Sequence, residues 1–343
     1  MLRAAPGNSL LLITAPVSTE TMPNHYSALP RPNTLRRAAT LAVFALAAAP
    51  LGAQTAPASS SPSTPAITSA VPAPPAQNTV LVLYYEHDFS ASLKSGASGK
   101  LNENIFGAGS QFKCDWSDNH WIESFGYLFT NNNFSGTNAP LFGNVQQIGF
   151  TDKFSHDFSP NWGVFVYGSA GLSAETKTSL LNGGQLAVAL GPTYQVNQDF
   201  SIDFGPMYYT RMQDANTWIP MADAKWAFLP QWELHAFAGV TNGVAVSYDV
   251  FNNQATVVEA SLDYNSNWFR IRNTAAGAGQ SVDETDTTFK IGVRQALSKN
   301  VFVRADGSAI FDREYQFHAN GNAANSFNVD STIGLGLELG VTF

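Results

Sequence analysis

Arginine is unevenly distributed along this chain of 343 residues, and its chemistry suggests a function for the region where it gathers. Six arginines follow residue 78, and five of them lie between positions 270 and 313. Arginine holds carboxylate and phosphate groups through paired N–H donors, so a row of arginines can select or orient anionic solutes. With one lysine added, they predict a basic stripe made of Arg270, Arg272, Lys290, Arg294 and Arg304.

Acidic residues accompany this basic stripe. They are Glu259, Asp263, Asp306 and Glu338. A wall of salt bridges is therefore the alternative to an anion-selective surface. The two interpretations are compatible, because rings of charged side chains also form the constrictions of pores.

Motifs for catalysis or metal binding are not found in the sequence. The six histidines are isolated, and none has a histidine or cysteine at metal-ligand spacing. There is no Gly-x-Ser-x-Gly motif, and the segment from Ser95 to Lys100 lacks the spacing of a phosphate-binding loop. Cys114 is predicted to be a small apolar residue of the wall rather than a reactive thiol. We therefore predict no catalytic residue, no metal site, no cofactor and no enzymatic activity.

The elements that position the charged residues are predicted to be β-strands. Apolar residues alternate with polar or small ones in many short segments, whereas no segment after Asn78 shows sustained helical periodicity. The segment Ser331 to Phe343 is the clearest case, with apolar side chains at every second position from Ile333 onward. The chain is therefore predicted to be all-β.

Charge fixes which face of each strand would meet lipid. Placing Arg or Lys at the lipid midplane costs roughly 2 to 4 kcal/mol, so charged side chains must point to the interior of a membrane barrel. This predicts that Arg270 and Arg272 point inward while Phe269 and Ile271 meet lipid. The other three residues of the basic stripe are likewise predicted to face the lumen.

Repeated turns separate a membrane barrel from a soluble sandwich. Short polar turns precede Trp121, Trp162, Phe200, Trp232, Trp268 and Val301. Tight turns at one end, each followed by an aromatic or apolar residue, predict the aromatic girdle of a membrane interface. Seven longer polar segments then form the opposite end: 90–103, 131–144, 175–184, 213–217, 241–254, 275–286 and 312–330. The pattern predicts an antiparallel transmembrane β-barrel of about fourteen strands, with twelve as the alternative.

The first part of the chain is predicted to lie outside the barrel. Arg36 and Arg37 precede an apolar run of twelve residues and small residues up to Ala53, which is the layout of a secretory signal peptide. We assign 1–53 to this signal, with Met22 as an alternative start, 54–78 to a Pro/Ala/Ser-rich linker, and 79–343 to the barrel. Residues 79–343 hold 14 basic and 25 acidic residues, a net charge of −11. Such an acidic domain is not expected to bind nucleic acid.

Together these features resemble Gram-negative outer-membrane β-barrel proteins, and most closely an uncharacterised family of them. The resemblance covers Thr79 to Phe343 and is carried by the hairpin repeat and by a last strand that ends in Phe343 after Val341 and Leu339. It implies location in the bacterial outer membrane after export through the periplasm. It also implies that this terminal aromatic strand is the signal that the barrel-assembly machinery recognises. The partners implied are outer-membrane lipid and lipopolysaccharide, besides a small solute.

The expected function is passive diffusion of small hydrophilic solutes, with the basic stripe favouring anions. A closed barrel that acts structurally or as an adhesin through its outer loops is the alternative, and a membrane-embedded enzyme comes third.

Overall fold

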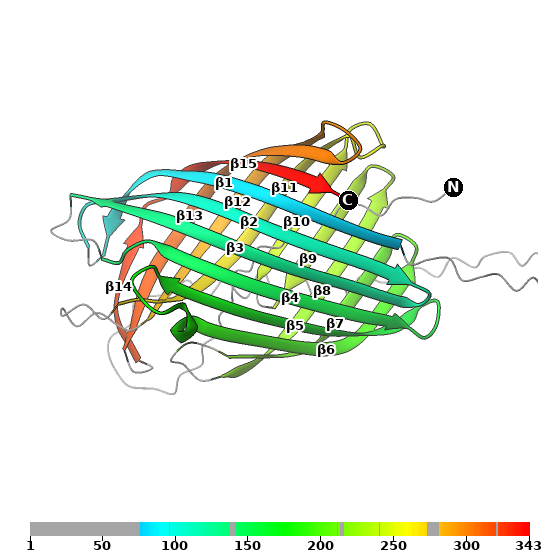
Figure 1. Ribbon diagram of the computed structural model, residues 1–343, viewed down its shortest axis with the longest axis horizontal. Helices are drawn as coiled ribbons and strands as arrows, with labels where there is room; N and C mark the ends of the chain where they lie inside the picture. The colour runs from blue at the N-terminus through cyan, green and yellow to red at the C-terminus, as the bar shows by residue number, and fades with distance from the viewer. Residues whose placement is uncertain are drawn as a thin grey trace, which may run out of the picture.

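The protein is a closed β-barrel that lies on its side in Figure 1. The computed structural model describes residues 76–95, 97–136, 141–210, 212, 216–239, 241–272, 281–319 and 322–343. The predicted signal peptide and most of the predicted linker lie outside these residues. Within the described ranges, the one helical segment is the short 3-10 turn η1, Leu180–Gly183, and no helix is long and apolar enough to cross a membrane.

All other elements are strands, and neighbours around the wall pair antiparallel. Their bounds are β1 Ala76–Lys94, β2 Lys100–Trp116, β3 Asn119–Ser135, β4 Val145–Asp157, β5 Trp162–Glu175, β6 Gly184–Asn197, β7 Phe200–Tyr209, β8 Thr217–Leu229, β9 Trp232–Ala238, β10 Asn242–Asp249, β11 Thr256–Arg270, β12 Ser281–Ala296, β13 Val301–Ala319, β14 Asn322–Val329 and β15 Thr332–Thr342. Strands β11 and β5 add one parallel contact, between Arg270 and Ala174.

These segments form fourteen positions in the wall, which confirms the predicted strand number. Strands β14 and β15 are consecutive parts of one position, because both pair with β13 on one side and with β1 on the other. The barrel closes where β1 meets β15, with Val80 opposite Thr342 and Asp88 opposite Gly334.

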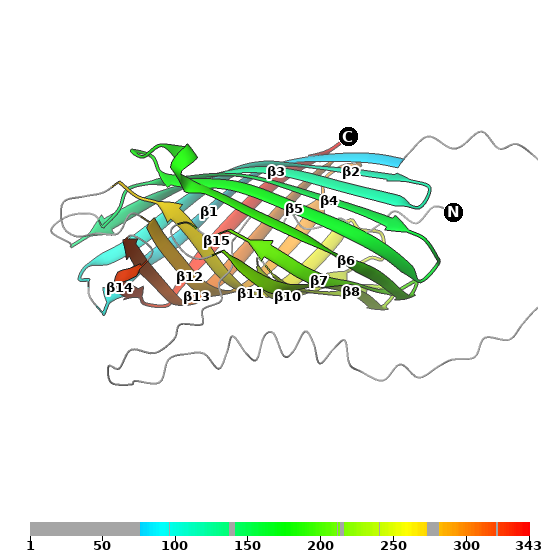
Figure 2. The same ribbon diagram turned by 90° about the horizontal axis from the view of Figure 1, so that it is seen from below.

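One side of the barrel is much taller than the other. Strands β1 and β13 have 19 residues each, whereas β9 has 7 and β10 has 8. Strands rise about 3.3 Å per residue, so the tall side extends far beyond the short one at the long-loop end. Figures 1 and 2 show this difference between β1–β3 and β8–β10. The predicted loops 90–103 and 312–330 were therefore wrong for most of their residues, which continue the strands of the tall side.

The fifth tight turn was also predicted at the wrong place. The sequence Asn-Ser-Asn before Trp268 was interpreted as a turn, but it lies inside β11. The turn at that end is instead 250–255, where Asn252 and Gln254 adopt positive φ. Its short preceding strand, β10, had been assigned to an outer loop. As a result, the first part of β11 runs in the direction opposite to the one predicted.

The outer face of the wall is apolar, as alternation predicted. Exposed side chains include Leu83 on β1, Ile291 on β12 and Leu335 on β15, with 61%, 52% and 58% of their surface accessible. Aromatic pairs from neighbouring strands lie near the tight turns, for example Trp162 with Tyr194 and Trp232 with Tyr248. These pairs match the predicted girdle.

Strands β6 and β7 approach each other closely at two glycines. A Cβ atom on Gly191 would collide with the carbonyl oxygen of Phe204, and one on Gly205 with that of Leu190. Only glycine fits at both positions, and each is followed by a proline that has no N–H to donate. The wall therefore bends here at the expense of its regular hydrogen-bond ladder.

Candidate functional site in the barrel interior

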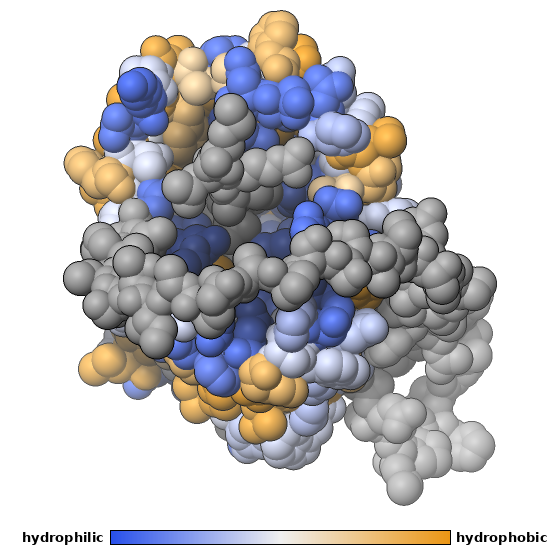
Figure 3. Space-filling model, turned by 90° about the vertical axis from the view of Figure 1, so that its right-hand side faces the viewer, coloured by the Kyte–Doolittle hydropathy of each residue, from blue (hydrophilic) through white to orange (hydrophobic). Residues whose placement is uncertain are grey.

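The inner face of the wall carries the charged side chains, because they alternate with the lipid-facing apolar ones. Figure 3 views the end at which the tight turns lie, and hydrophilic residues gather around its centre with hydrophobic residues at its periphery. The candidate functional site is this interior.

Three residues of the predicted basic stripe lie together on β12 and β13. Lys290, Arg294 and Arg304 project inward, and Arg294 lies directly opposite Arg304. The Nζ atom of Lys290 is 2.9 Å from Oε2 of Glu86, and Nη2 of Arg304 is 2.9 Å from Oε1 of Glu259. Two of the three are thus held in ion pairs rather than left free to bind solute.

Arg294 differs from its two neighbours. Its Nη2 donates to the amide oxygen of Gln254 at 3.2 Å, and its guanidinium carbon lies 5.6 Å from the centre of the Phe302 ring. It lies near the tight-turn end of the lumen, because Gln254 belongs to the turn 250–255.

Arg270 and Arg272 lie apart from the other three, at the long-loop end. Arg270 ends β11 and pairs with Ala174 of β5, and the backbone N–H of Arg272 donates to Oε2 of Glu175 at 2.7 Å. Their predicted neighbours Phe269 and Ile271 do not meet lipid: they are only 2% and 3% exposed. That expectation was wrong because β11 is one continuous strand, paired with β12 as far as Arg270, and alternation from the inward-facing Glu259 puts Phe269 on the inner face. Arg270 therefore takes the opposite face of β11, against the prediction that it points inward.

The four predicted acidic partners have different neighbours in the structure. Glu259 and Asp306 both contact Arg304, the second with a carboxylate oxygen 3.7 Å from Nε. Asp263 instead accepts a hydrogen bond from Ser261 at 2.7 Å. Glu338 lies in the next strand opposite Arg304, with Tyr84 on its other side.

A buried cluster around Arg313 was not predicted. Its guanidinium contacts the carboxylates of Asp88, Glu103 and Glu284, and the hydroxyl of Tyr315 donates to Glu103 and Glu284. Arg313 had been predicted to lie in the loop 312–330. The positive φ of Asp312 marks an irregularity that shifts the inward face by one residue, so strict alternation from Arg304 misses it.

A second unpredicted cluster lines the opposite wall. Lys153 of β4 reaches Asp203 of β7 at 2.5 Å and Asp223 of β8 at 3.2 Å, and His235 lies 2.7 Å from Asp223. These residues are up to 82 positions apart in the chain, from 153 to 235. No local sequence signal relates them.

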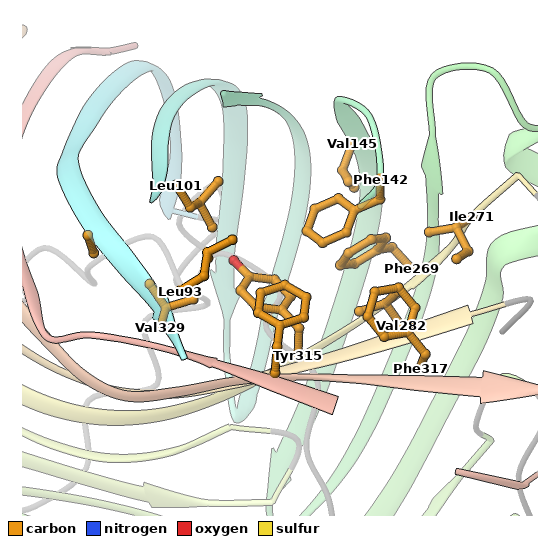
Figure 4. Close-up of a cluster of buried hydrophobic side chains, with 12 residues drawn as sticks. Leu93, Leu101, Phe142, Val145, Phe269, Ile271, Val282, Tyr315, Phe317 and Val329 are labelled. Carbon is orange, nitrogen blue, oxygen red and sulfur yellow. The ribbon is translucent and has the colours of Figure 1, made fainter. Parts of the chain in front are cut away.

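An apolar core fills the interior at the long-loop end. Its side chains come from β1, β2, β4 and β11–β14, together with Phe142 from the connection between β3 and β4. The ring of Phe142 lies 5.1 to 5.2 Å from those of Phe134, Phe269 and Tyr315. Figure 4 shows Phe142, Phe269 and Tyr315 pointing toward one another between the strand ends. We call this cluster the neck; among the described residues it packs within the interior at the long-loop end.

The predicted assembly signal lies on the outer surface. Phe343 is 69% exposed and Leu339 is 44% exposed, with Val341 at the alternating position between them. The backbone of Phe343 exchanges hydrogen bonds with Thr79. The terminal strand therefore presents its apolar side chains outward at the seam.

The described residues hold no metal-binding cluster of three or more His, Cys, Asp or Glu side chains. Cys114 is buried in β2 and forms no disulfide.

Comparisons with known proteins give structural neighbours but no sequence relative. No family model matches the chain, and no curated protein matches it. An outer membrane channel from Pseudomonas putida F1 is 13% identical, with a TM-score of 0.45, and the match covers 81% of this chain and 100% of that one.

Two further solved structures illustrate the range. A Pseudomonas aeruginosa FadL homologue is 9% identical, with a TM-score of 0.41 and coverage of 78% and 89%. The KdgM porin is 8% identical, with a TM-score of 0.31 and coverage of 75% and 97%. The neighbours are outer-membrane β-barrel proteins, as the resemblance implied, and the similarity concerns the fold alone.

Proposed function

We propose that the protein is a passive channel of the bacterial outer membrane for small hydrophilic solutes. The observation that carries the proposal is the interior of the barrel, where charged side chains from opposite walls keep part of their surface accessible. Lys153 and Lys290 lie on different walls, and 20% and 28% of their side-chain surface is accessible. An apolar or fully packed interior would have no such side chains.

The charge of the interior favours cations over anions. The anion preference predicted from the basic stripe stays a prediction, but Lys290 and Arg304 are paired with carboxylates. Carboxylates also outnumber cations in the described clusters, for example three around Arg313 and two around Lys153. We therefore propose that a permeating solute is neutral or positively charged.

The neck makes this channel a gated one. Its aromatic side chains pack together at the long-loop end among the described residues, so conduction past them requires Phe142 to leave the cluster.

Single-channel recording tests the proposal. The full-length chain would be expressed in a Gram-negative host, purified from the outer membrane and reconstituted in a planar bilayer under a salt gradient. We expect discrete conductance steps and a reversal potential on the cation side. Neutralising Asp203 and Asp223 together should move the reversal potential toward the anion side. A folded barrel that never conducts, even after Phe142→Ala, would refute the channel.

A closed barrel with a structural or adhesive role is the second candidate, and the filled neck is the observation that favours it. In that case the long-loop end would bind its partner with no permeation at all. Both proposals include three further expectations: export through the periplasm, contact with lipopolysaccharide, and recognition of the last strand by the assembly machinery. They are supported by the apolar outer face and by the exposed terminal strand.

A further inference from the structure

Two glycines of β15 leave space between charged residues of its neighbours. Gly334 lies between Asp88 of β1 and Ser308 of β13, and Gly336 lies between Glu86 and Asp306 of the same two strands. All of these residues face the interior. Because the central strand contributes no side chain in either row, oxygen atoms from both neighbours reach over it.

The oxygens converge in front of Gly334. A Cβ atom there would lie 2.6 Å from Oδ1 of Asp88 and 3.2 Å from Oε1 of Glu86, and it would also collide with Oγ of Ser308. The hydroxyl of Ser308 is 3.1 Å from the same Glu86 oxygen. Three oxygens therefore converge in front of Gly334, and a side chain at position 334 would displace them.

One of these oxygens has no partner. Asp88 is only 1% exposed, and its Oδ1 makes no hydrogen bond, whereas its Oδ2 is 2.8 Å from Nη2 of Arg313. Glu86 is 4% exposed and uses Oε2 in the same way, at 2.9 Å from Nζ of Lys290. Each carboxylate thus binds its cation through the far oxygen and turns the near one to the space at Gly334. A buried carboxylate oxygen without a partner is costly and calls for a ligand.

The surrounding charge is negative. Lys290 and Arg313 lie among five buried or half-buried carboxylates: Glu86, Asp88, Glu103, Glu284 and Asp306. Arg304 partly neutralises the charge of Asp306, but it also pairs with Glu259. The Oδ1 atom of Asp306 is a second buried oxygen without a hydrogen bond, and it borders Gly336.

We propose that the space in front of Gly334 is a binding site for a hard metal cation of the calcium class. Asp88 and Glu86 supply carboxylate oxygens, and Ser308 supplies a hydroxyl. Oxygen donors without sulfur or imidazole favour such a cation, and water molecules complete its coordination. The set has only two carboxylates and a hydroxyl, so it differs from clusters of three or more acidic or histidine ligands.

The bound cation would neutralise the excess of carboxylates directly beneath the neck. Arg313 connects the site to the neck through Tyr315. The Tyr315 hydroxyl donates to Glu103 and Glu284, which also contact Arg313. The ring of Tyr315 packs on Phe142, in the neck. The site does not depend on the channel function, since a closed barrel would need the same compensation.

Terbium luminescence tests the proposal with a defined probe. The full-length chain would be refolded into detergent in metal-free buffer, with Tb³⁺ or Ca²⁺ present during refolding because the site is buried. Tyr84 donates a hydrogen bond to Glu86 and would sensitise bound Tb³⁺. We expect one tightly bound Tb³⁺ per barrel, displaced by Ca²⁺ but not by an equal concentration of Na⁺.

Two variants and a control assign the signal to this site. Gly334→Ala fills the space and should abolish the tight site, while Ser308→Ala removes one oxygen without adding volume and should weaken binding at least tenfold. Gly126→Ala adds a methyl group to the inner face of β3, where no atom lies within 4 Å, and should leave binding unchanged. Heat-modifiable migration on a gel verifies folding of each variant.

The proposal is overturned if wild-type barrels bind no stoichiometric Tb³⁺ or Ca²⁺. It is also overturned if Ser308→Ala binds as tightly as the wild type, since the excess charge would then be neutralised elsewhere or by protons. Should Gly334→Ala fail to fold, Ser308→Ala alone decides the question.

Discussion

Truncating Phe142 should open the barrel. This side chain is 5% exposed, comes from a connecting segment rather than from the wall, and contacts aromatic rings of β3, β11 and β13. Losing its burial costs about 2 kcal/mol, and losing its aromatic pairs costs about 1 kcal/mol more. Since 1.4 kcal/mol corresponds to a factor of ten in an equilibrium constant, a loss of about 3 kcal/mol raises the ratio of open to closed neck roughly a hundredfold.

Single-channel recording of Phe142→Ala measures this shift directly. We expect the fraction of time spent conducting to rise steeply, while the current through one open channel changes little because the middle of the lumen is unaltered. The matched control is Phe158→Ala, which removes a ring of the same size that is 65% exposed near the tight turns. That variant should behave as the wild type. If Phe142→Ala folds, retains its heat-modifiable migration and conducts no more often than the control, the neck is not the barrier.

Three further predictions concern the wall and its assembly. Arg304→Ala leaves Glu259 and Asp306 without their shared cation, and should lower the free energy of unfolding in urea by about 3 kcal/mol; Glu259→Gln should cost less, and equal effects would contradict the pairing. Gly191→Ala places a methyl group against the carbonyl of Phe204 and should prevent refolding to the heat-modifiable form, whereas Gly168→Ala, with nothing within 4 Å, should refold normally. Deleting Phe343 should lower the amount of barrel in the outer membrane of cells but leave refolding in detergent intact; unchanged cellular levels would contradict its role in assembly.

The fold class and strand number could be predicted because alternation is a local property. The last strand illustrates this, since Leu335, Leu337 and Leu339 are all exposed on the outer face, as their spacing indicates. The error at Asn265 to Trp268 arose because polar residues usually end a strand. Here they continue β11, where the side-chain amide of Asn265 donates to Asp286 at 2.9 Å.

The candidate site could be predicted only in part. Lys290 and Arg304 project inward, as their strands' alternation requires, but their ion pairs join segments far apart in the sequence, such as Glu86 with Lys290. Strict alternation also fails at Asp312, whose positive φ moves Arg313 to the inner face. Phe269 and Ile271 are buried because β11 continues through the predicted turn, which places Phe269 on the inner face within the neck.

The seam between β1 and β15 has a consequence for the order of folding. Val80 pairs with Thr342, so the first and last parts of the described chain are neighbours in the finished wall. Loop closure over so many residues is slow, and β1 cannot pair with β15 until β15 has been made. Until then the polypeptide has an unpaired strand edge at β1, and any factor that shields this edge must remain bound until β15 is present. Mutations that weaken the pairing of β1 with β15 should thus prolong the exposure of this strand edge more than they destabilise the folded barrel.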